Sequence, residues 1–422
     1  MANNFDSNVT KKVMLKVAEA YESQRNLSKM VNTQMFAGEF NANTGDKVYG
    51  KRPTDYTSVR TSDGDITGQN KDIVTGQFQA TVQDMITVPV EYGAVDEAIN
   101  MGTDQNRFWD DIARRLVVDE ELDLTAFTMA GAGLSVGTVG TGVTEWGEVA
   151  EAGALMSSTG VSKSKKWCYF VNPYSMTSLA NQQRGLGVNP EVQTANQEAM
   201  IRKNFAGFDV FEATTMSSYT TGTGAGRAGT IASNPDVTYV TAKDTMQQTI
   251  AVTAFQANLV IAAGETVTIA GRNRLNLSTR QPVLDASGAP VPFTATVAQT
   301  VTLDGSGAGN LVVTGPAIFE ATGAYNTVDS APVAADVVTL GGAANTVIQP
   351  NMFWHPDAFG VVSIKMPKLH STDTIYTSKD GLQIRCSKYS DGAANKQEVR
   401  FDIHRAYGVI DPFKAGLGFG TP

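Results

Sequence analysis

The spacing of apolar residues predicts helices at the start of the chain and again after residue 100. Val9, Val13, Val17 and Tyr21 recur every four residues between charged positions, so we expect the chain to open with an amphipathic helix. A second apolar series at helical spacing predicts a long helix over residues 104–130, with one side against a core. The first helix has only a narrow apolar stripe, and we therefore expect it to lie against another surface.

Alternation of apolar and polar residues predicts strands between and after these helices. Residues 86–92 alternate as a half-buried strand, and Pro89 indicates a sheet edge because proline cannot donate a backbone hydrogen bond. A strand at 167–171 followed at once by a helix over 173–180 is typical of mixed packing. Further strands are predicted at 360–366, 382–388 and 398–410. These parts together predict an α+β domain.

Residues 214–348 differ from both flanks in composition and in hydrophobic period. Only 13 of these 135 residues are charged, against 62 of the other 287. Runs in which apolar residues alternate with threonine predict strands with one buried face. The predicted strands are 237–242, 249–255, 265–271, 293–303, 310–319 and 336–340. Six short strands at this spacing are typical of a small antiparallel barrel or sandwich, and we take the barrel, inserted into the α+β domain, as the prediction.

Residues 41–81 form a polar connection with turn signals at 44–46 and 63–65. A connection of this length is unusual inside a compact domain unless it has a function or is disordered. We therefore expect it either to be disordered or to reach out and contact something.

The charge of the chain argues against nucleic-acid binding. Lys and Arg number 33 and Asp and Glu 42, a net charge of −9, and charged residues make up only 18% of the chain. Binding to phosphate backbones needs clustered cations. The two cysteines, Cys168 and Cys386, indicate a reducing compartment or at most one bridge, and we expect both to be buried. The sequence lacks a signal-peptide pattern and a membrane-spanning run, so we expect a soluble protein of cytoplasmic origin with no membrane partner.

One motif suggests a serine hydrolase. Residues 133–137 fit a nucleophile elbow centred on Ser135, and His355, His370 and His404 follow in the right chain order. The elbow requires a strand before the serine and a helix after it, whereas here a long helix precedes it. We keep a hydrolase using Ser135 as an alternative.

Two other patterns have plainer interpretations. The glycine-rich residues 224–229 resemble a dinucleotide-binding turn, but Pro235 soon blocks the helix that such a turn needs, and a linker into the barrel is favoured. The acidic residues within 119–123 point in different directions on a helix, which predicts a solvated or partner-facing surface rather than a metal site. We expect no catalytic residues, no metal and no cofactor.

Five segments resemble the major capsid (coat) proteins of short-tailed double-stranded-DNA bacteriophages whose coat carries an insertion domain. The segments are 45–53, 64–71, 366–371, 388–395 and 400–402. The resemblance runs nearly end to end and is weakest in the predicted barrel. It implies the tailed-phage major capsid fold, an α+β fold with an inserted six-stranded antiparallel β-barrel.

The resemblance also implies a division of the chain. Residues 1–40 would be an N-terminal arm and 41–81 an extended loop that lies over a neighbouring subunit. The remaining parts are a peripheral domain (82–145 and 395–422, with a spine helix at 104–130), an axial domain (146–213 and 349–394) and the inserted barrel (214–348).

The function implied is that of a structural shell protein and not an enzyme. Many copies would co-assemble with a scaffolding protein and a portal protein into an icosahedral procapsid in the host cytoplasm, which then matures and encloses double-stranded DNA without sequence-specific binding. The expected interaction residues are Val13, Val17, Tyr21, Lys51, Arg52, Arg60, Asp63, Asp65, Lys243 and Asp244. A tail-fibre or carbohydrate-binding module, suggested by the threonine-rich strands, remains a further alternative.

Overall fold

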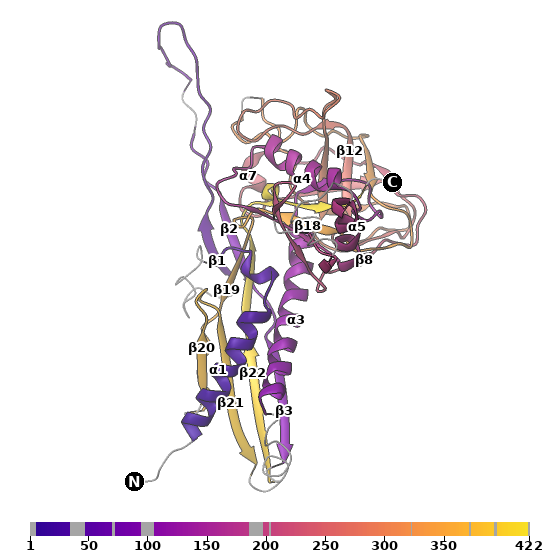
Figure 1. The fold of residues 1–422 in the computed structure, drawn as a ribbon. Helices are drawn as coiled ribbons and strands as arrows, with labels where there is room; N and C mark the ends of the chain where they lie inside the picture. Colours follow the sequence, from indigo (N-terminus) through magenta and orange to yellow (C-terminus); the bar gives the residue numbers. More distant parts are fainter. Residues whose placement is uncertain are drawn as a thin grey trace. The chain divides into compact units, whose positions relative to one another are not determined.

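The computed structural model divides the chain into two compact units. It describes residues 6–33, 47–69, 72–93, 105–184, 197–201, 204–321, 323–370, 373–391 and 395–420. Unit 1 comprises Met1–Tyr49, Gln79–Thr125 and Phe359–Gly408, and unit 2 comprises Gly50–Phe78, Ala126–Ala358 and Val409–Pro422. Both mix helices with strands (Figure 1), so the predicted α+β class is confirmed.

Unit 1 is built on an antiparallel sheet in the order β20-β21-β22-β3. Its strands are β20 (Thr374–Thr377), β21 (Gln383–Asp391), β22 (Lys396–Ile403) and β3 (Ile86–Gly93). Helix α1 (Asp6–Gln24) and the first part of α3 (Gln105–Gly131) pack their apolar sides into one core with this sheet. Trp109 lies edge-on to Phe401 at 5.9 Å between ring centroids. Because β3 is the last strand in the order, the prediction that Pro89 marks an edge is confirmed.

A second sheet has the order β1-β2-β23-β19. Its strands are β1 (Lys47–Lys51), β2 (Gln77–Val82), β23 (Arg405–Val409) and β19 (Phe359–Ser363), and the short helix η1 (Leu27–Lys29) follows α1. The strand expected over 398–410 is therefore two strands, β22 and β23. His404 separates them, and the two strands belong to different sheets.

Unit 2 contains a six-stranded mixed sheet in the order β4-β24-β18-β5-β7-β6. Its strands are β4 (Leu134–Val136), β24 (Ala415–Gly418), β18 (Asn351–Trp354), β5 (Trp167–Val171), β7 (Phe208–Glu212) and β6 (Asn204–Phe205). Helices α4 (Trp146–Thr159) and α5 (Pro173–Arg184) share its core, and the short helix η2 (Pro412–Lys414) precedes β24. All five residues of β5 are buried, which is why its sequence is a continuous apolar run.

The barrel of unit 2 is closed, with the strand order β10-β15-β13-β12-β16-β9. Its strands are β9 (Ala228–Ile231), β10 (Gln247–Thr253), β12 (Thr266–Asn273), β13 (Pro292–Val297), β15 (Gly309–Thr314) and β16 (Val337–Leu340). The described pairings are antiparallel, as predicted. One predicted strand is wrong, because residues 237–242 contain the short helix α7 (Tyr239–Ala242) and the sixth strand is β9. The glycine-rich approach to β9 hid that strand in the sequence.

Two small ribbons complete unit 2. They are β8 (Tyr219–Thr220) with β17 (Val347–Ile348), and β11 (Val260–Ile261) with β14 (Val301–Thr302). The first ribbon joins the entry and exit of the barrel. Thr221 strengthens this neck, because its N–H donates to Thr346 O at 3.0 Å and its hydroxyl donates to Ala343 O at 2.6 Å.

The barrel packs firmly against the rest of unit 2. Asn276 donates from Nδ2 to the carbonyl of Ser158 at 2.6 Å, and the N–H of Leu277 donates to the carbonyl of Thr159 at 2.9 Å, so the barrel caps the C-terminal end of α4. Arg274 is fully buried and donates to the carbonyls of Gly133 and Thr294. Its guanidinium also lies over the rings of two phenylalanines, residues 293 and 413.

Two other expectations have clear outcomes. The long helix spans Gln105–Gly131, one residue from its predicted bounds. Cys168 and Cys386 are buried, as expected, and both are free. Within the described ranges, no helix is long and apolar enough to cross a membrane.

Candidate interaction surfaces

The long connection between β1 and β2 is described at residues 52–69 and 72–76, and most of these residues are exposed. It lies within the segment expected at 41–81, and from here on the name extended loop refers to residues 52–76. Figure 1 shows its tip standing away from the barrel and the mixed sheet of unit 2. The predicted interaction residues Lys51, Arg60, Asp63 and Asp65 all lie on it or at its start with exposed side chains. They are therefore free to contact another molecule, and such contact stays a prediction.

The described turn of the extended loop is held by aspartates. Asp63 accepts the N–H of Asp65 at 3.2 Å, and Asp65 accepts the N–H and the hydroxyl of Thr67 at 2.9 and 2.6 Å. The Thr67 hydroxyl bond, followed by its N–H bond, lowers the pKa of Asp65 below its usual value. Gly64 and Gly68 adopt positive φ angles of 78° and 75°, which other residues reach at a cost. The turn signal in the sequence therefore describes a real, self-bonded turn.

The extended loop also exposes large apolar side chains. Tyr56 is 68% exposed, Ile66 54% and Ile73 66%. Single exposed apolar residues are ordinary, but Val59, at 39% exposure, is a fourth on the same loop, and moving these side chains out of water would be favourable. This loop is the described segment best suited to contact a second molecule.

The base of the extended loop is fixed within unit 2 by Arg52. Its side chain is buried, with Nε donating to the carbonyls of Lys243 at 3.0 Å and Gln77 at 3.3 Å. The guanidinium also donates to the carbonyls of Ile410 and Val409. Burial lowers the pKa of Arg52 from its ordinary value, and neighbouring acids, Asp411 first, oppose that shift. Arg52 therefore holds the loop to its own subunit rather than presenting a free charge.

Lys243 and Asp244, predicted as interaction residues, lie beside Arg52 after α7. Asp244 accepts the N–H of Gln77 through Oδ1 at 3.2 Å, and Lys243 supplies the carbonyl that Arg52 binds. Both side chains are partly buried. The structure thus brings three predicted residues together at the base of the loop, inside one chain.

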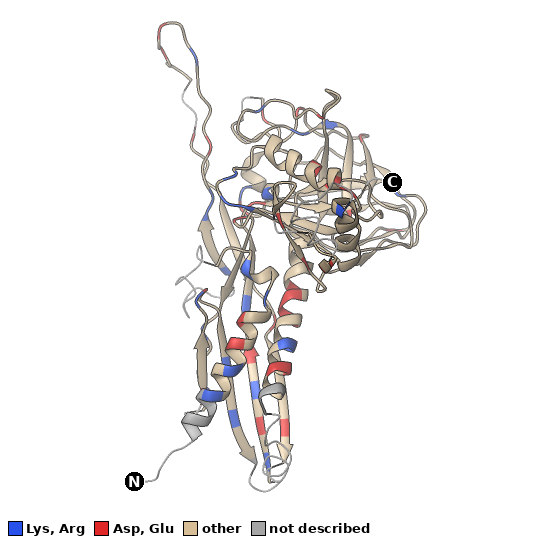
Figure 2. Cartoon of the chain, viewed as in Figure 1, with Lys and Arg blue, Asp and Glu red and all other residues tan. Residues whose placement is uncertain are grey.

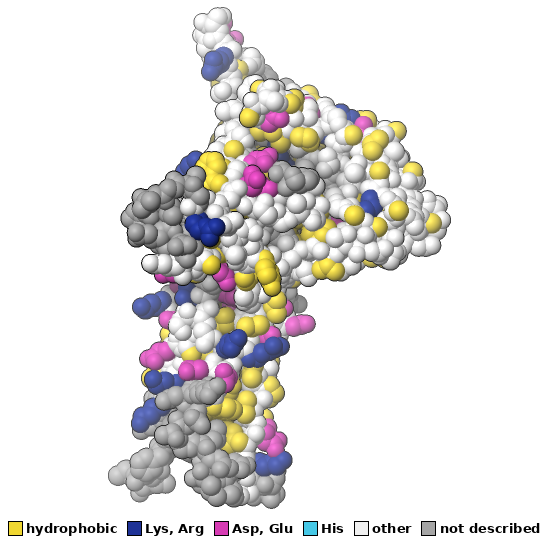
Figure 3. Space-filling model, turned by 45° about the vertical axis from the view of Figure 1, so that its right-hand side comes forward, with side chains coloured by type: hydrophobic (Ala, Val, Ile, Leu, Met, Phe, Trp, Pro, Cys, Tyr) yellow, Lys and Arg dark blue, Asp and Glu magenta, His cyan; other side chains and the backbone are white. Residues whose placement is uncertain are grey.

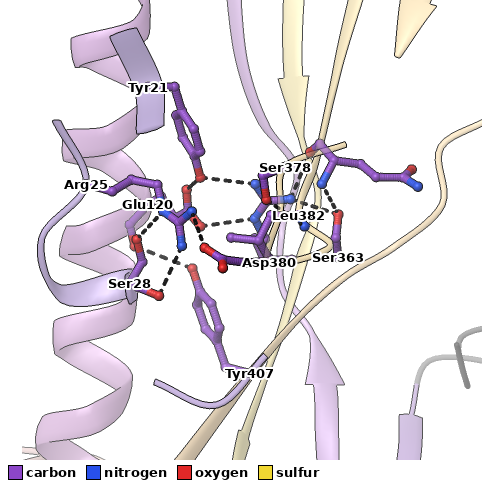
Figure 4. A network of polar contacts seen from close by, with 11 residues as sticks. Tyr21, Arg25, Ser28, Glu120, Ser363, Ser378, Asp380, Leu382 and Tyr407 are labelled. Atoms are coloured by element: carbon purple, nitrogen blue, oxygen red, sulfur yellow. Dashed lines mark hydrogen bonds and ion pairs between the residues drawn. The ribbon is translucent and has the colours of Figure 1, made fainter. Parts of the chain in front are cut away.

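The predicted residues of the N-terminal arm face inward. Val17 and Tyr21 are fully buried in the core of unit 1, and Val13 packs against the same core. Tyr21 donates its hydroxyl to Glu120 of α3, and Figure 4 shows these two side chains meeting with Tyr407 nearby. These residues of α1 contribute to the core of unit 1.

A buried ionic network surrounds that contact. Arg405 donates from Nε to Glu120 Oε1 at 3.0 Å and from a terminal nitrogen to the Tyr21 hydroxyl at 3.1 Å. It also donates to the Ser363 hydroxyl and the Gln383 carbonyl, both at 2.8 Å. Burial alone would lower the pKa of Arg405, but Glu120 and Tyr21 raise it overall, and burial with the Glu120 charge raises the pKa of Tyr21. The network joins α1, α3 and β23 through residues whose sequence spacing gives no signal.

The expectation for the acidic residues of α3 is wrong at two positions. Glu120 is 1% exposed and Glu121 4%, so neither lies on a solvated surface. Glu121 accepts the N–H groups of Asn26 at 2.6 Å and Leu27 at 3.0 Å, which anchors the start of η1 to α3. A helical wheel cannot tell a solvated carboxylate from one that is paired across a core. The residues that the structure describes contain no group of three or more metal-binding side chains.

The hydrolase alternative lacks supporting geometry. Ser135 lies inside strand β4, paired in parallel with Leu417 of β24, and not in a strand-to-helix turn. Among the described residues no hydrogen bond joins Ser135 to a histidine. His355 is buried and its Nδ1 accepts the N–H of Asp357 at 3.1 Å, which occupies that nitrogen.

Charge is unevenly distributed between the units. Figure 2 shows Lys, Arg, Asp and Glu frequent along α1, α3, β21 and β22, and sparse over the strands of the barrel. On the face drawn in Figure 3, side chains of both signs are interspersed, and apolar side chains over the barrel are scattered.

Comparisons with known proteins agree on one family. A model of that family, "P22 coat protein - gene protein 5", matches residues 1–420. The chain is 34% identical over 427 residues to a major capsid protein of Acyrthosiphon pisum secondary endosymbiont phage 1, and the match covers 100% of both chains.

Solved structures with similar chains have much lower identity. A chain from Mycobacterium phage Che8 has 9% identity and a TM-score of 0.45, with 93% of this chain and 90% of that chain covered. The capsid of cyanophage P-SCSP1u has 10% identity and a TM-score of 0.43, with 89% and 84% covered. The virus-like particle of Pyrococcus furiosus has 7% identity and a TM-score of 0.42, with 97% and 98% covered.

The family match and the curated relative span the whole chain, so the resemblance stated from the sequence is confirmed. A protein of this kind is a structural component of the virion shell. The chain belongs to the P22 coat protein family and is a bacteriophage major capsid protein.

Proposed function

We propose that many copies of the chain co-assemble with a scaffolding protein and a portal protein into an icosahedral procapsid. Assembly takes place in the host cytoplasm, and the procapsid matures to enclose double-stranded DNA. The family assignment over residues 1–420 supports a shell role. The net charge of −9 suits a container, because an acidic wall does not bind packaged phosphate tightly.

The observation that carries the intersubunit part of this proposal is the extended loop. Its base is anchored by Arg52, while Tyr56, Ile66 and Ile73 project into solvent. Contact with a neighbouring subunit buries these side chains, and each fully buried apolar side chain of this size contributes about 1.5–3 kcal/mol. In this proposal Lys51, Arg60, Asp63 and Asp65 provide polar contacts around them.

The remaining divisions of the chain are part of the same proposal. Residues 82–145 and 395–422 form the peripheral domain, 146–213 and 349–394 the axial domain, and 214–348 the inserted barrel, with 1–40 as the arm. Residues 34–46 lie outside the described residues, and so do the end of the arm proposed at 1–40 and the start of the extended loop proposed at 41–81.

The test is assembly of purified subunits with and without a scaffolding protein, observed by negative-stain electron microscopy. Tyr56→Ser combined with Ile66→Ser removes exposed apolar surface without disturbing a core. Leu284→Ser, also at a side chain that is 56% exposed but on the barrel, is the matched control.

We expect closed shells from the unmodified chain and from the Leu284→Ser variant, and soluble unassembled subunits from the loop variant. Persistent monomers of the unmodified chain under all conditions would overturn the shell proposal. Normal shells from the loop variant would overturn the assignment of the extended loop as an intersubunit contact.

A further inference from the structure

We propose that the inserted barrel braces the extended loop and sets the direction in which the loop leaves the subunit. The consequence for shell assembly rests on the proposed function of the loop, whereas the brace itself is a property of the single subunit. The loop has two legs at its base, an outgoing leg (residues 51–57) and a returning leg (residues 72–77). Contacts from the barrel reach both of them.

The outgoing leg is held at two levels. Nearest the body, Arg52 binds the carbonyl of Lys243, directly after α7. Further out, Asp55 forms an ion pair with Arg280 of the barrel, and Asp55 donates its N–H to the hydroxyl of Tyr325 at 3.0 Å. Arg280 is itself fixed by a bond to the carbonyl of Asn326 at 2.8 Å.

The returning leg is held by the same parts of the barrel. Val74 accepts the hydroxyl of Tyr325 at 3.1 Å, and Gln77 donates its N–H to Asp244. Gly76 lies so close to the barrel that an added Cβ would meet the Lys243 carbonyl oxygen at 2.5 Å. This contact leaves no room for any side chain at position 76.

Tyr325 connects the two legs to each other. Its hydroxyl accepts from the outgoing leg and donates to the returning leg, so a single oxygen holds both. Its ring stacks on Tyr239 with centroids 3.6 Å apart and planes 4° from parallel. Tyr239 is 4% exposed, and this stacking gives Tyr325 a fixed position.

The contacts between barrel and loop, here called pins, are separate hydrogen bonds, one ion pair and the close approach at Gly76, and they do not form a continuous packed interface. A hollow of about 450 Å³ lies between the legs and the barrel and is lined by both. A polar loop with so little packing of its own would otherwise sample many directions, and ordering each backbone residue costs about 1–2 kcal/mol. Removing a pin should therefore free the loop without unfolding the barrel.

The loop direction can be measured in the unassembled full-length subunit by pulsed electron spin resonance. Labels are placed at Ser58→Cys on the loop and Gln299→Cys on the barrel, both at exposed positions. Cys168 and Cys386 are 3% and 1% exposed, so they stay unlabelled in the folded chain. The measured quantity is the distribution of distances between the two labels.

Two variants remove different pins. Gly76→Ala forces the returning leg away from Lys243, and its matched control is Gly305→Ala, where an added Cβ meets nothing within 4 Å. Tyr325→Phe deletes the shared hydroxyl but keeps the ring stack, so its fold should be intact. Circular dichroism checks that each variant is folded.

We expect the unmodified subunit and Gly305→Ala to give the same narrow distribution. Gly76→Ala and Tyr325→Phe should broaden it about twofold or shift its centre, as for a tethered but unbraced loop. If the folded Tyr325→Phe variant keeps the narrow distribution, the brace is overturned, whether or not the chain forms shells.

Assembly then tests the consequence. A variant with a broadened distribution should form fewer closed shells or irregular ones, while Gly305→Ala assembles normally. Normal shells from a variant whose loop is demonstrably freed would overturn the claim that the barrel directs the loop for assembly. Absence of shells from the unmodified chain would count against the proposed shell function and leave the distance measurement valid on its own.

Discussion

Replacing Glu120 with glutamine should severely destabilise unit 1. Arg405 is 2% exposed and has Glu120 as its carboxylate partner at 3.0 Å. In Glu120→Gln the Arg405 charge stays buried without a counter-charge, and breaking a buried pair in this way typically costs 3–5 kcal/mol, so we expect a loss of about 4 kcal/mol. Tyr21→Phe should cost less, about 1–3 kcal/mol, because it removes only a neutral hydroxyl from the network.

The assay is hydrogen exchange of the unassembled subunit, followed by mass spectrometry. Peptides from β21 and β22 report opening of unit 1, and peptides from the barrel strands serve as an internal reference. Asp119→Asn is the control variant, since Asp119 pairs with Arg115 at 2.9 Å on the helix surface. A pair of that kind contributes about 0.3–0.5 kcal/mol.

We expect Glu120→Gln to speed exchange in β21 and β22 and to leave the barrel peptides unchanged. The reasoning fails if Glu120→Gln lowers the opening free energy of β21 and β22 by no more than Asp119→Asn does. That result would mean that water or a shifted side chain compensates the buried positive charge of Arg405.

Three further predictions concern unit 2 and the cysteines. Burial raises the pKa of Cys168 and Cys386 to about 12, so at pH 8 only about one thiol in ten thousand is ionised. Ellman's reagent should therefore find no reactive thiol in the folded chain and two after denaturation. Arg274→Ala leaves a cavity at a fully buried position, so it should lower the barrel's free energy of unfolding by about 2–5 kcal/mol and its urea midpoint with it. Arg274→Met fills more of that volume and should lower the free energy of unfolding by less. Burial lowers the pKa of His355, so below about pH 6.5 the unfolded chain binds a proton there more readily than the folded chain does, and stability should fall as the pH drops. In a pH series of urea unfolding midpoints, His355→Gln should reduce this fall.

Sequence patterns predicted most of the helices and strands, because the period of buried side chains in each element is set by residues close together along the chain. The helix over Gln105–Gly131 shows the helical period of apolar residues, and strand β5 (Trp167–Val171) shows as a short, continuous apolar run. The barrel was recognisable because its strands alternate and its charge is low. β9 was missed, since its four residues follow a glycine-rich segment and are too few for a period to show.

The candidate surfaces were predicted less completely. The sequence marked residues 41–81 as a long polar connection, but it could not separate Arg52, which is buried, from Arg60, which is exposed. Both are arginines in a polar segment with no apolar period. The difference arises because backbone carbonyls from residues 243, 409 and 410 meet at Arg52, and only the folded chain places them there.

The sequence by itself determined the class of fold, the inserted barrel and the family, because those depend on local periodicity, composition and similarity along the chain. The tertiary structure alone decided which polar residues act inside the subunit. Glu120 and Arg405 are 285 positions apart, and Asp55 and Arg280 are 225 apart. Pairing across such distances is set by how the elements pack and leaves no mark in the spacing of residues, so the role of each charge became visible only in the folded chain.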